Sequence, residues 1–186
     1  ASDVYKRQGF MSTATIIGDT TNGFYCYLDG GGLVISYDKN LADAERGYFS
    51  FYYNEEDWET STNGEKFINN AHVVTWSKYE VIHPISQEEA NDTNVAENCQ
   101  LPSLLGIGYG YRGYFDLHAG FSTFNSITGE KIQGKISLVY DPQEQTQDSL
   151  KLQLYYNPNT PDDWSKTQTD YETVSCDISS LVNLSL

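Results

Sequence analysis

The chain has 186 residues, 26 Asp and Glu against 11 Lys and Arg, and a formal net charge of −15. That length can bury a sizeable core without disulfide or metal staples, as one large β domain or two small fused ones. The charge argues against a nucleic-acid-binding surface, which needs clustered Lys and Arg, and no apolar run approaches the roughly 18 to 20 residues of a membrane-spanning helix.

The first ten residues read ASDVYKRQGF and precede Met11, the only methionine of the chain. Their composition matches nothing downstream, and the string resembles a translated cloning adapter. We therefore set residues 1–10 apart as a non-native leader and take Met11 as the expected start. A cytoplasmic location then follows by default, and a secreted one follows if a natural leader was lost.

Two parts of the chain resemble each other at an offset of 103 residues. The segment LVISYD at 33–38 corresponds to ISLVYD at 136–141, and FYYN at 51–54 corresponds to LYYN at 154–157. In both copies the matching tyrosines lie 15 positions apart, so the register persists through two strands and their connection. Alternate residues are apolar, which is the period of a strand with one face on a core. This pattern predicts a duplicated β unit.

The repeats are predicted at 11–85 and 104–186, with 86–103 as an acidic linker or long loop containing one helical turn. Each repeat supplies about four strands. We therefore predict an all-β protein, in which both repeats share one compact domain. The expected fold is an antiparallel β-sandwich or flattened barrel of about eight to ten strands.

An acidic loop with a tryptophan follows the matched strands in each copy. Oxygen ligands at short spacing suit calcium, and an exposed aromatic ring suits a sugar or another surface ligand. Turn capping by the acids, with the Trp closing one end of the sandwich, is the alternative. The candidate metal ligands are Glu55, Glu56, Asp57, Asp162 and Asp163, and the candidate ligand-binding residues are Trp58, Trp164, Tyr53 and Tyr156. If both loops lie at one end, they form a negative rim that a cation would stabilise.

Cysteine and histidine offer no recognisable catalytic or metal motif. Cys26, Cys99 and Cys176 are far apart in sequence, and their odd number permits at most one disulfide, so reduced thiols are expected. The three histidines have no ligand spacing, and no nucleophile motif is present. No catalytic residue is predicted, and calcium is the only cofactor that the acidic loops suggest.

Three functions remain open from sequence. The first is a non-enzymatic, lectin-like binding module for a glycan or a protein surface. The second is a structural protein that assembles into an oligomer or particle. The third is a cofactor-independent β-barrel cyclase or isomerase, which would need an interior pocket lined by His118 or Cys26.

Overall fold

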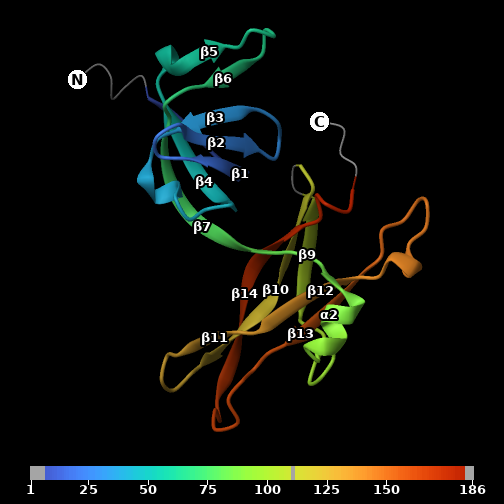
Figure 1. Ribbon diagram of the computed structural model, residues 1–186. Coiled ribbons are helices and arrows are strands. Elements are labelled where there is room, and N and C mark those ends of the chain that lie inside the picture. The colour runs from blue at the N-terminus through green and yellow to red at the C-terminus, as the bar shows by residue number, and fades with distance from the viewer. Residues whose placement is uncertain (1–6, 110–111, 183–186) are drawn as a thin grey trace. The chain divides into compact units, whose positions relative to one another are not determined.

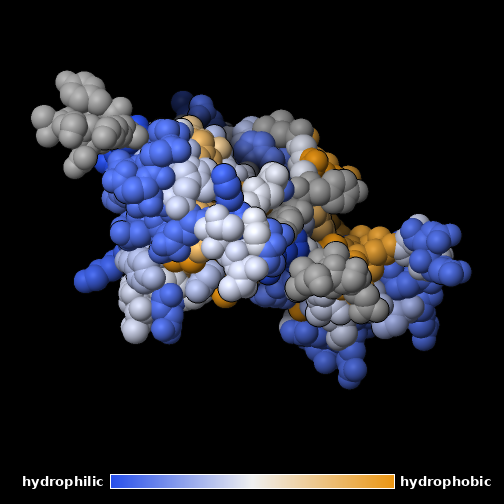
Figure 2. Space-filling model, turned by 90° about the horizontal axis from the view of Figure 1, so that it is seen from above, coloured by the Kyte–Doolittle hydropathy of each residue, from blue (hydrophilic) through white to orange (hydrophobic). Residues whose placement is uncertain are grey.

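The computed structural model describes residues 7–109 and 112–182, and it confirms the all-β class with about 53% strand and 9% helix (Figure 1). The chain divides into two compact units, with the change at Val81 and Ile82. Unit 1 runs up to Val81 and includes Arg112, and unit 2 holds the other described residues. Hydrophilic residues cover most of the surface visible in Figure 2, in keeping with the net charge of −15.

The strands of unit 1 are hydrogen-bonded to one another in the order β7-β4-β1-β2-β3-β6-β5. They are β1 (Gln8–Asp19), β2 (Gly23–Leu28), β3 (Leu33–Ser36), β4 (Arg46–Tyr53), β5 (Trp58–Thr60), β6 (Lys66–Ile68) and β7 (His72–Ile82). All pairs are antiparallel except β3 with β6, which pair in parallel at Val34 and Ile68. β6 and β7 follow each other in the chain yet pair with different parts of the sheet. The sheet of unit 1 is therefore mixed, and it does not form a closed barrel.

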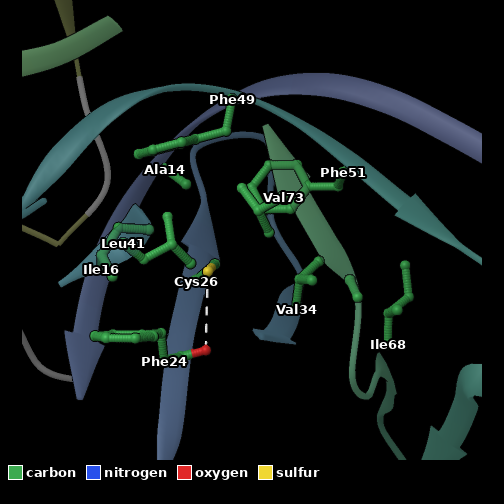
Figure 3. Close-up of a cluster of buried hydrophobic side chains, with 11 residues drawn as sticks. Ala14, Ile16, Phe24, Cys26, Val34, Leu41, Phe49, Phe51, Ile68 and Val73 are labelled. Carbon is green, nitrogen blue, oxygen red and sulfur yellow. Dashed lines mark hydrogen bonds between the residues drawn. The ribbon is translucent and has the colours of Figure 1, made fainter. Parts of the chain in front are cut away.

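Alternation along β4 builds the core of unit 1. Phe49 and Phe51 point inward and are completely buried, whereas Tyr48 and Tyr52 belong to the opposite face. Each buried Phe contributes about 1.5–3 kcal/mol relative to an exposed one. The labelled side chains converge on one interior in Figure 3: Ala14, Ile16, Phe24, Cys26, Val34, Leu41, Phe49, Phe51, Ile68 and Val73.

An ion pair between the buried Arg46 and the partly buried Asp29 joins β4 to the end of β2 within unit 1. The Arg46 guanidinium donates from Nη1 to Asp29 Oδ1 at 2.8 Å and from Nη2 to Asp29 Oδ2 at 3.0 Å. Nη1 also donates to Thr15 Oγ1 at 2.9 Å, and Arg46 has no exposed surface. The paired geometry satisfies a charge that would be costly to bury alone.

Unit 2 is a β-sandwich of two small sheets. Its strands are β8 (Ile85–Ser86), β9 (Leu104–Tyr109), β10 (Tyr114–Asn125), β11 (Lys131–Gln133), β12 (Lys135–Tyr140), β13 (Leu152–Asn157) and β14 (Thr167–Asp177). β10 pairs with β14 along one edge and with β9 and then β11 along the other. β12 pairs with β13, and with β8 in parallel. The two sheets share a core of Leu117, Ala119, Phe121, Leu138, Tyr156, Val174 and Cys176.

The predicted linker at 86–103 is part of unit 2. It begins with Ser86, the last residue of β8, and contains the helix α2 (Gln87–Asp92), whose N-terminus is capped by the Ser86 hydroxyl accepting from Glu89 N at 3.1 Å. Ala90 and Val95 are buried against Val139 of β12. The helical turn expected from sequence is therefore a short helix that packs on the smaller sheet.

The two predicted repeats differ in their pairing. β12 and β13 form a direct antiparallel hairpin, whereas β3 and β4 pair with other strands. The cause lies in the connections: Leu41 in the 3₁₀ turn Lys39–Leu41 is completely buried, whereas the equivalent turn Pro142–Glu144 buries no residue. In unit 1 the connection fills the core and carries the chain to a new partner. Residues 8–10, set apart in the sequence analysis, form the start of β1 opposite 51–53 of β4.

Burial separates the three free thiols into two classes. Desolvation raises the pKa of both Cys26 and Cys176 to about 12, and Cys99 is exposed. The reactive species is the thiolate, so at pH 8 the two buried thiols stay protonated as well as shielded. We expect one thiol to react with a disulfide reagent in the native protein and three after denaturation. Fast reaction of two or more native thiols would contradict the burial described here.

Candidate ligand-binding site

A cavity of about 260 Å³ opens where β4 ends in unit 1. Its wall comes from the last residues of β4, the 3₁₀ turn Glu55–Asp57 and the start of β7. The lining residues are Arg7, Tyr52, Tyr53, Asn54, Asp57, Asn70 and His72. We call this cavity the aromatic pocket, because ring side chains supply one wall and amide and carboxylate groups supply the rest.

Strand pairing sets the aromatic wall. Tyr52 of β4 is the direct partner of His72 of β7, so their side chains leave the sheet on the same face. The two ring centroids are 6.4 Å apart with an interplanar angle of 31°. The Arg7 guanidinium lies 5.0 Å from the Tyr52 ring centroid.

A hydrogen-bonded turn holds the polar wall in place. Asn54 N donates to Asp57 Oδ2 at 2.7 Å, which is the Asp57 arm of a capping box, and Asp57 N donates to the backbone oxygen of Asn54 at 3.0 Å to close the 3₁₀ turn. Asn69 N also donates to Asp57 O at 2.8 Å, which ties the turn to the segment before β7. Asn70 next to it has φ of +60°, a left-handed conformation that Asn adopts more readily than most residues.

Asp38 orients the His72 ring. The Nδ1 atom of His72 lies 2.8 Å from Asp38 Oδ2, and the same oxygen accepts from Val73 N at 2.6 Å. With Nδ1 engaged by the carboxylate, Nε2 is the ring nitrogen available to a ligand. The His72 side chain is half exposed, so this nitrogen is reachable from solvent.

The first-copy candidates lie in or beside this pocket. Tyr53 and Asp57 line it, and the Trp58 ring on β5 stands edge-on to Tyr53 with centroids 5.8 Å apart. Trp58 is 41% exposed, enough to contact a ligand. Glu55 accepts from Gln8 Nε2 at 3.1 Å, and Glu56 is exposed.

The second-copy candidates lie in unit 2 in a different setting. Tyr156 is only 4% exposed and packs edge-on against Phe121 at 5.8 Å, and burial raises its pKa. It is a core residue with little surface for a ligand. Trp164 is half-buried in the turn that follows Pro161, beside the exposed Asp162 and Asp163.

In the described residues, the five candidate acidic side chains do not come together as a set of three metal ligands. Within residues 7–109 and 112–182, the five candidate acids do not bring three ligand oxygens within 4.8 Å of one another. Asp57 is engaged in the capping box described above. Calcium binding stays a prediction, which a calcium-dependent rise in melting temperature beyond that in matched NaCl would support.

Of the seven residues that line the pocket, the sequence analysis proposed Tyr53 and Asp57, and it missed Tyr52, Asn70 and His72 among the other five. Tyr52 belongs to the outward face of β4, and the period of two does reveal this, but it does not show that a pocket lies there. His72 has no ligand spacing in the sequence, and Asn70 belongs to no recognisable motif. Both reach the pocket because β7 pairs with β4, a non-local contact without a local sequence signal.

The residues suggested for an enzymatic pocket are placed elsewhere. Cys26 is completely buried in the core of unit 1. His118 is exposed on β10, with Nδ1 3.0 Å from Thr173 Oγ1. Neither residue lines the aromatic pocket.

Comparison with known proteins gives structural neighbours only. No family model matches the chain, and no curated protein is significantly similar in sequence. Solved structures cover 93–94% of this chain, which in turn spans 79% of each of them. They are a "Putative lipoprotein" from Bacteroides fragilis (14% identity, TM-score 0.55), a "Putative TOXIN related protein" from Parabacteroides distasonis (16%, 0.54) and a "NigD-like immunity protein" from Bacteroides caccae (16%, 0.50). At these identities the likeness shows a shared fold.

Helices of the described segments are all too short or too polar to cross a membrane.

Substitution of Asp57 in the capping box tests whether this turn holds the polar wall of the pocket in place. Asp57→Ala removes the acceptor of Asn54 N, and we expect a loss of about 1 kcal/mol in the free energy of unfolding, as for other helix caps. Glu56→Ala removes an exposed neighbouring carboxylate and should change stability by no more than about 0.5 kcal/mol. Urea denaturation of both variants measures the difference. Equal effects would show that Asp57 does not hold the turn.

Proposed function

We propose that this protein is a non-catalytic binding module whose aromatic pocket takes one ring of a neutral saccharide. The observation that carries the proposal is the convergence of Tyr52, Tyr53, Asn54, Asp57, Asn70 and His72 on one cavity. Ring faces can stack on the apolar face of a sugar, while amide, carboxylate and imidazole groups can exchange hydrogen bonds with its hydroxyls.

The size of the pocket favours a small group. Its volume of about 260 Å³ lies just under the range of roughly 300–1,000 Å³ typical of small-molecule sites. One sugar ring at the end of a longer glycan suits such a cavity. Trp58, exposed beside Tyr53, offers a second surface for the next residue of the glycan.

The charge of the protein narrows the ligand further. A net charge of −15 repels anionic saccharides and polynucleotides as they approach, which supports a neutral glycan even though the Arg7 guanidinium lies in the pocket. The strand order of unit 1 resembles that of the oligonucleotide- and oligosaccharide-binding fold, a partly open barrel, and this analogy supports a saccharide ligand because the charge disfavours a polynucleotide.

A glycan ligand fits an extracytoplasmic protein. One of the structural neighbours is named "Putative lipoprotein", which supports the secreted alternative of the sequence analysis for this chain.

Single substitutions test the pocket directly. A glycan array selects neutral oligosaccharides, and calorimetric titration then compares the wild type with Tyr52→Ala and Asn70→Gly. Loss of a stacked ring or of a hydrogen-bonding amide should weaken binding about tenfold or more, equivalent to at least about 1.4 kcal/mol. Asn70→Gly keeps the left-handed backbone, so it removes the amide without new strain.

Matched controls separate binding from folding. Tyr52→Phe keeps the ring and should keep most of the affinity, and Trp164→Phe in unit 2 should leave affinity unchanged. An array without hits, or affinity that is indifferent to Tyr52→Ala, would contradict the saccharide proposal.

A further inference from the structure

A second surface of unit 1 lies on the outward face of β1, β4 and β7. It carries four exposed apolar side chains, which we call the neutral face: Met11 (48% exposed), Tyr48 (36%), Val74 (37%) and Trp76 (62%). Strand pairing places them together, because Met11 and Val74 both lie opposite Ser50, one on each side of β4. Exposed apolar groups that gather in this way mark interaction surfaces more often than isolated ones do.

Trp76 is held in position for contact. It lies in the irregular step of the β4–β7 pairing, between Ser77, opposite Tyr48, and Thr75, opposite Phe49. Its indole Nε1 donates to Ser50 Oγ at 2.6 Å, and Ser50 is buried. The only polar atom of the side chain is therefore satisfied inside the protein, and the exposed ring is ready to bury apolar area.

Met11 and Tyr48 extend the same surface. The Tyr48 hydroxyl lies 3.8 Å from Met11 Sδ. A polarisable thioether beside an aromatic ring makes an adaptable apolar contact.

The three strands are free of charge where they form this face. No Asp, Glu, Lys or Arg occurs in 8–18, 47–54 or 67–77, although the chain as a whole carries −15. The four side chains of the neutral face offer a charged partner no ion pair. A neutral partner is favoured, and a second copy of the chain offers the same neutral face.

We propose that the neutral face mediates self-association, with two copies packing face to face about a two-fold axis. In such an isologous contact, both copies use the same surface patch. The acidic surfaces of two copies repel each other, so the neutral face is the surface through which two copies can associate. The proposal does not depend on saccharide binding in the aromatic pocket.

The salt dependence of this dimer distinguishes it from an ion-paired one. Raising NaCl from 0.15 to 1 M shortens the Debye length from about 8 to about 3 Å and screens the repulsion between the two anionic copies. The apolar contact is not screened. Self-association should therefore strengthen with salt, whereas an interface built from ion pairs would weaken.

Sedimentation of the full chain tests the proposal at both salt concentrations. The protein concentration runs from about 10 μM to 1 mM, a range suited to a small and weak interface. We expect a monomer–dimer equilibrium that Trp76→Ala and Val74→Lys each weaken about tenfold or more, because Lys at the two-fold contact faces its own copy. Val74→Thr keeps a neutral β-branched residue and should weaken it less. Thr62→Lys adds the same charge in the exposed turn between β5 and β6 and should not weaken it.

Circular dichroism of each variant confirms that it is folded before its sedimentation is interpreted. A monomer throughout the concentration range at both salt concentrations would overturn the proposal. So would a dimer that folded Val74→Lys and Trp76→Ala leave intact, or one that dissociates as salt rises. A monomeric protein that captures an unrelated neutral protein through Trp76 would assign the face to another partner and also overturn self-association.

Discussion

The register of β4 between β1 and β7 is the constraint on which the functional surfaces of unit 1 depend. Phe49 and Phe51 are completely buried, and this fixes which residues of β4 point outward. A slip of one residue would bring Tyr48 and Tyr52 into the core and expose both phenylalanines, at a cost of several kcal/mol. The aromatic pocket and the neutral face are thus consequences of one packing arrangement.

The distribution of charge favours neutral ligands and partners at the aromatic pocket and the neutral face. The chain carries a formal net charge of −15, and hydrophilic residues make up much of the surface visible in Figure 2. The three central stretches of unit 1 carry no charge, so they can bury apolar area without desolvating an ion. The pocket at the end of β4 adds polar groups already held by their own hydrogen bonds, which favours a neutral ligand rich in hydroxyls.

Local patterns in the sequence predicted local features of the fold. Alternation predicted strands at β4 and β13, with Phe49 and Phe51 on the core side, and it placed Tyr156 on the same face as Leu154. Tyr156 was nevertheless proposed as a ligand residue, because alternation does not show whether a strand end is covered. In unit 2 the opposing sheet covers it.

Pairing partners were beyond the reach of local patterns. The similarity between 33–54 and 136–157 predicted equivalent strands, but β12 and β13 pair directly while β3 and β4 do not. The burial of Leu41 and the parallel pairing of Val34 with Ile68 both depend on contacts between residues that are far apart in the sequence. His72 and Asn70 enter the pocket only through such contacts, which explains why sequence reasoning found Tyr53 and Asp57 and missed these two.

Amide chemical shifts measure the central claim most directly. In a ¹⁵N–¹H correlation spectrum of the isotopically labelled protein, titration with a neutral oligosaccharide selected by array should shift the amides of Tyr52, Tyr53, Asn54, Asn70 and His72. The amides of Leu138, Tyr156 and Val174 in the core of unit 2 should stay unchanged. Shifts confined to residues outside the aromatic pocket would contradict the account, because the ligand would then bind without the groups that the register of β4 brings together.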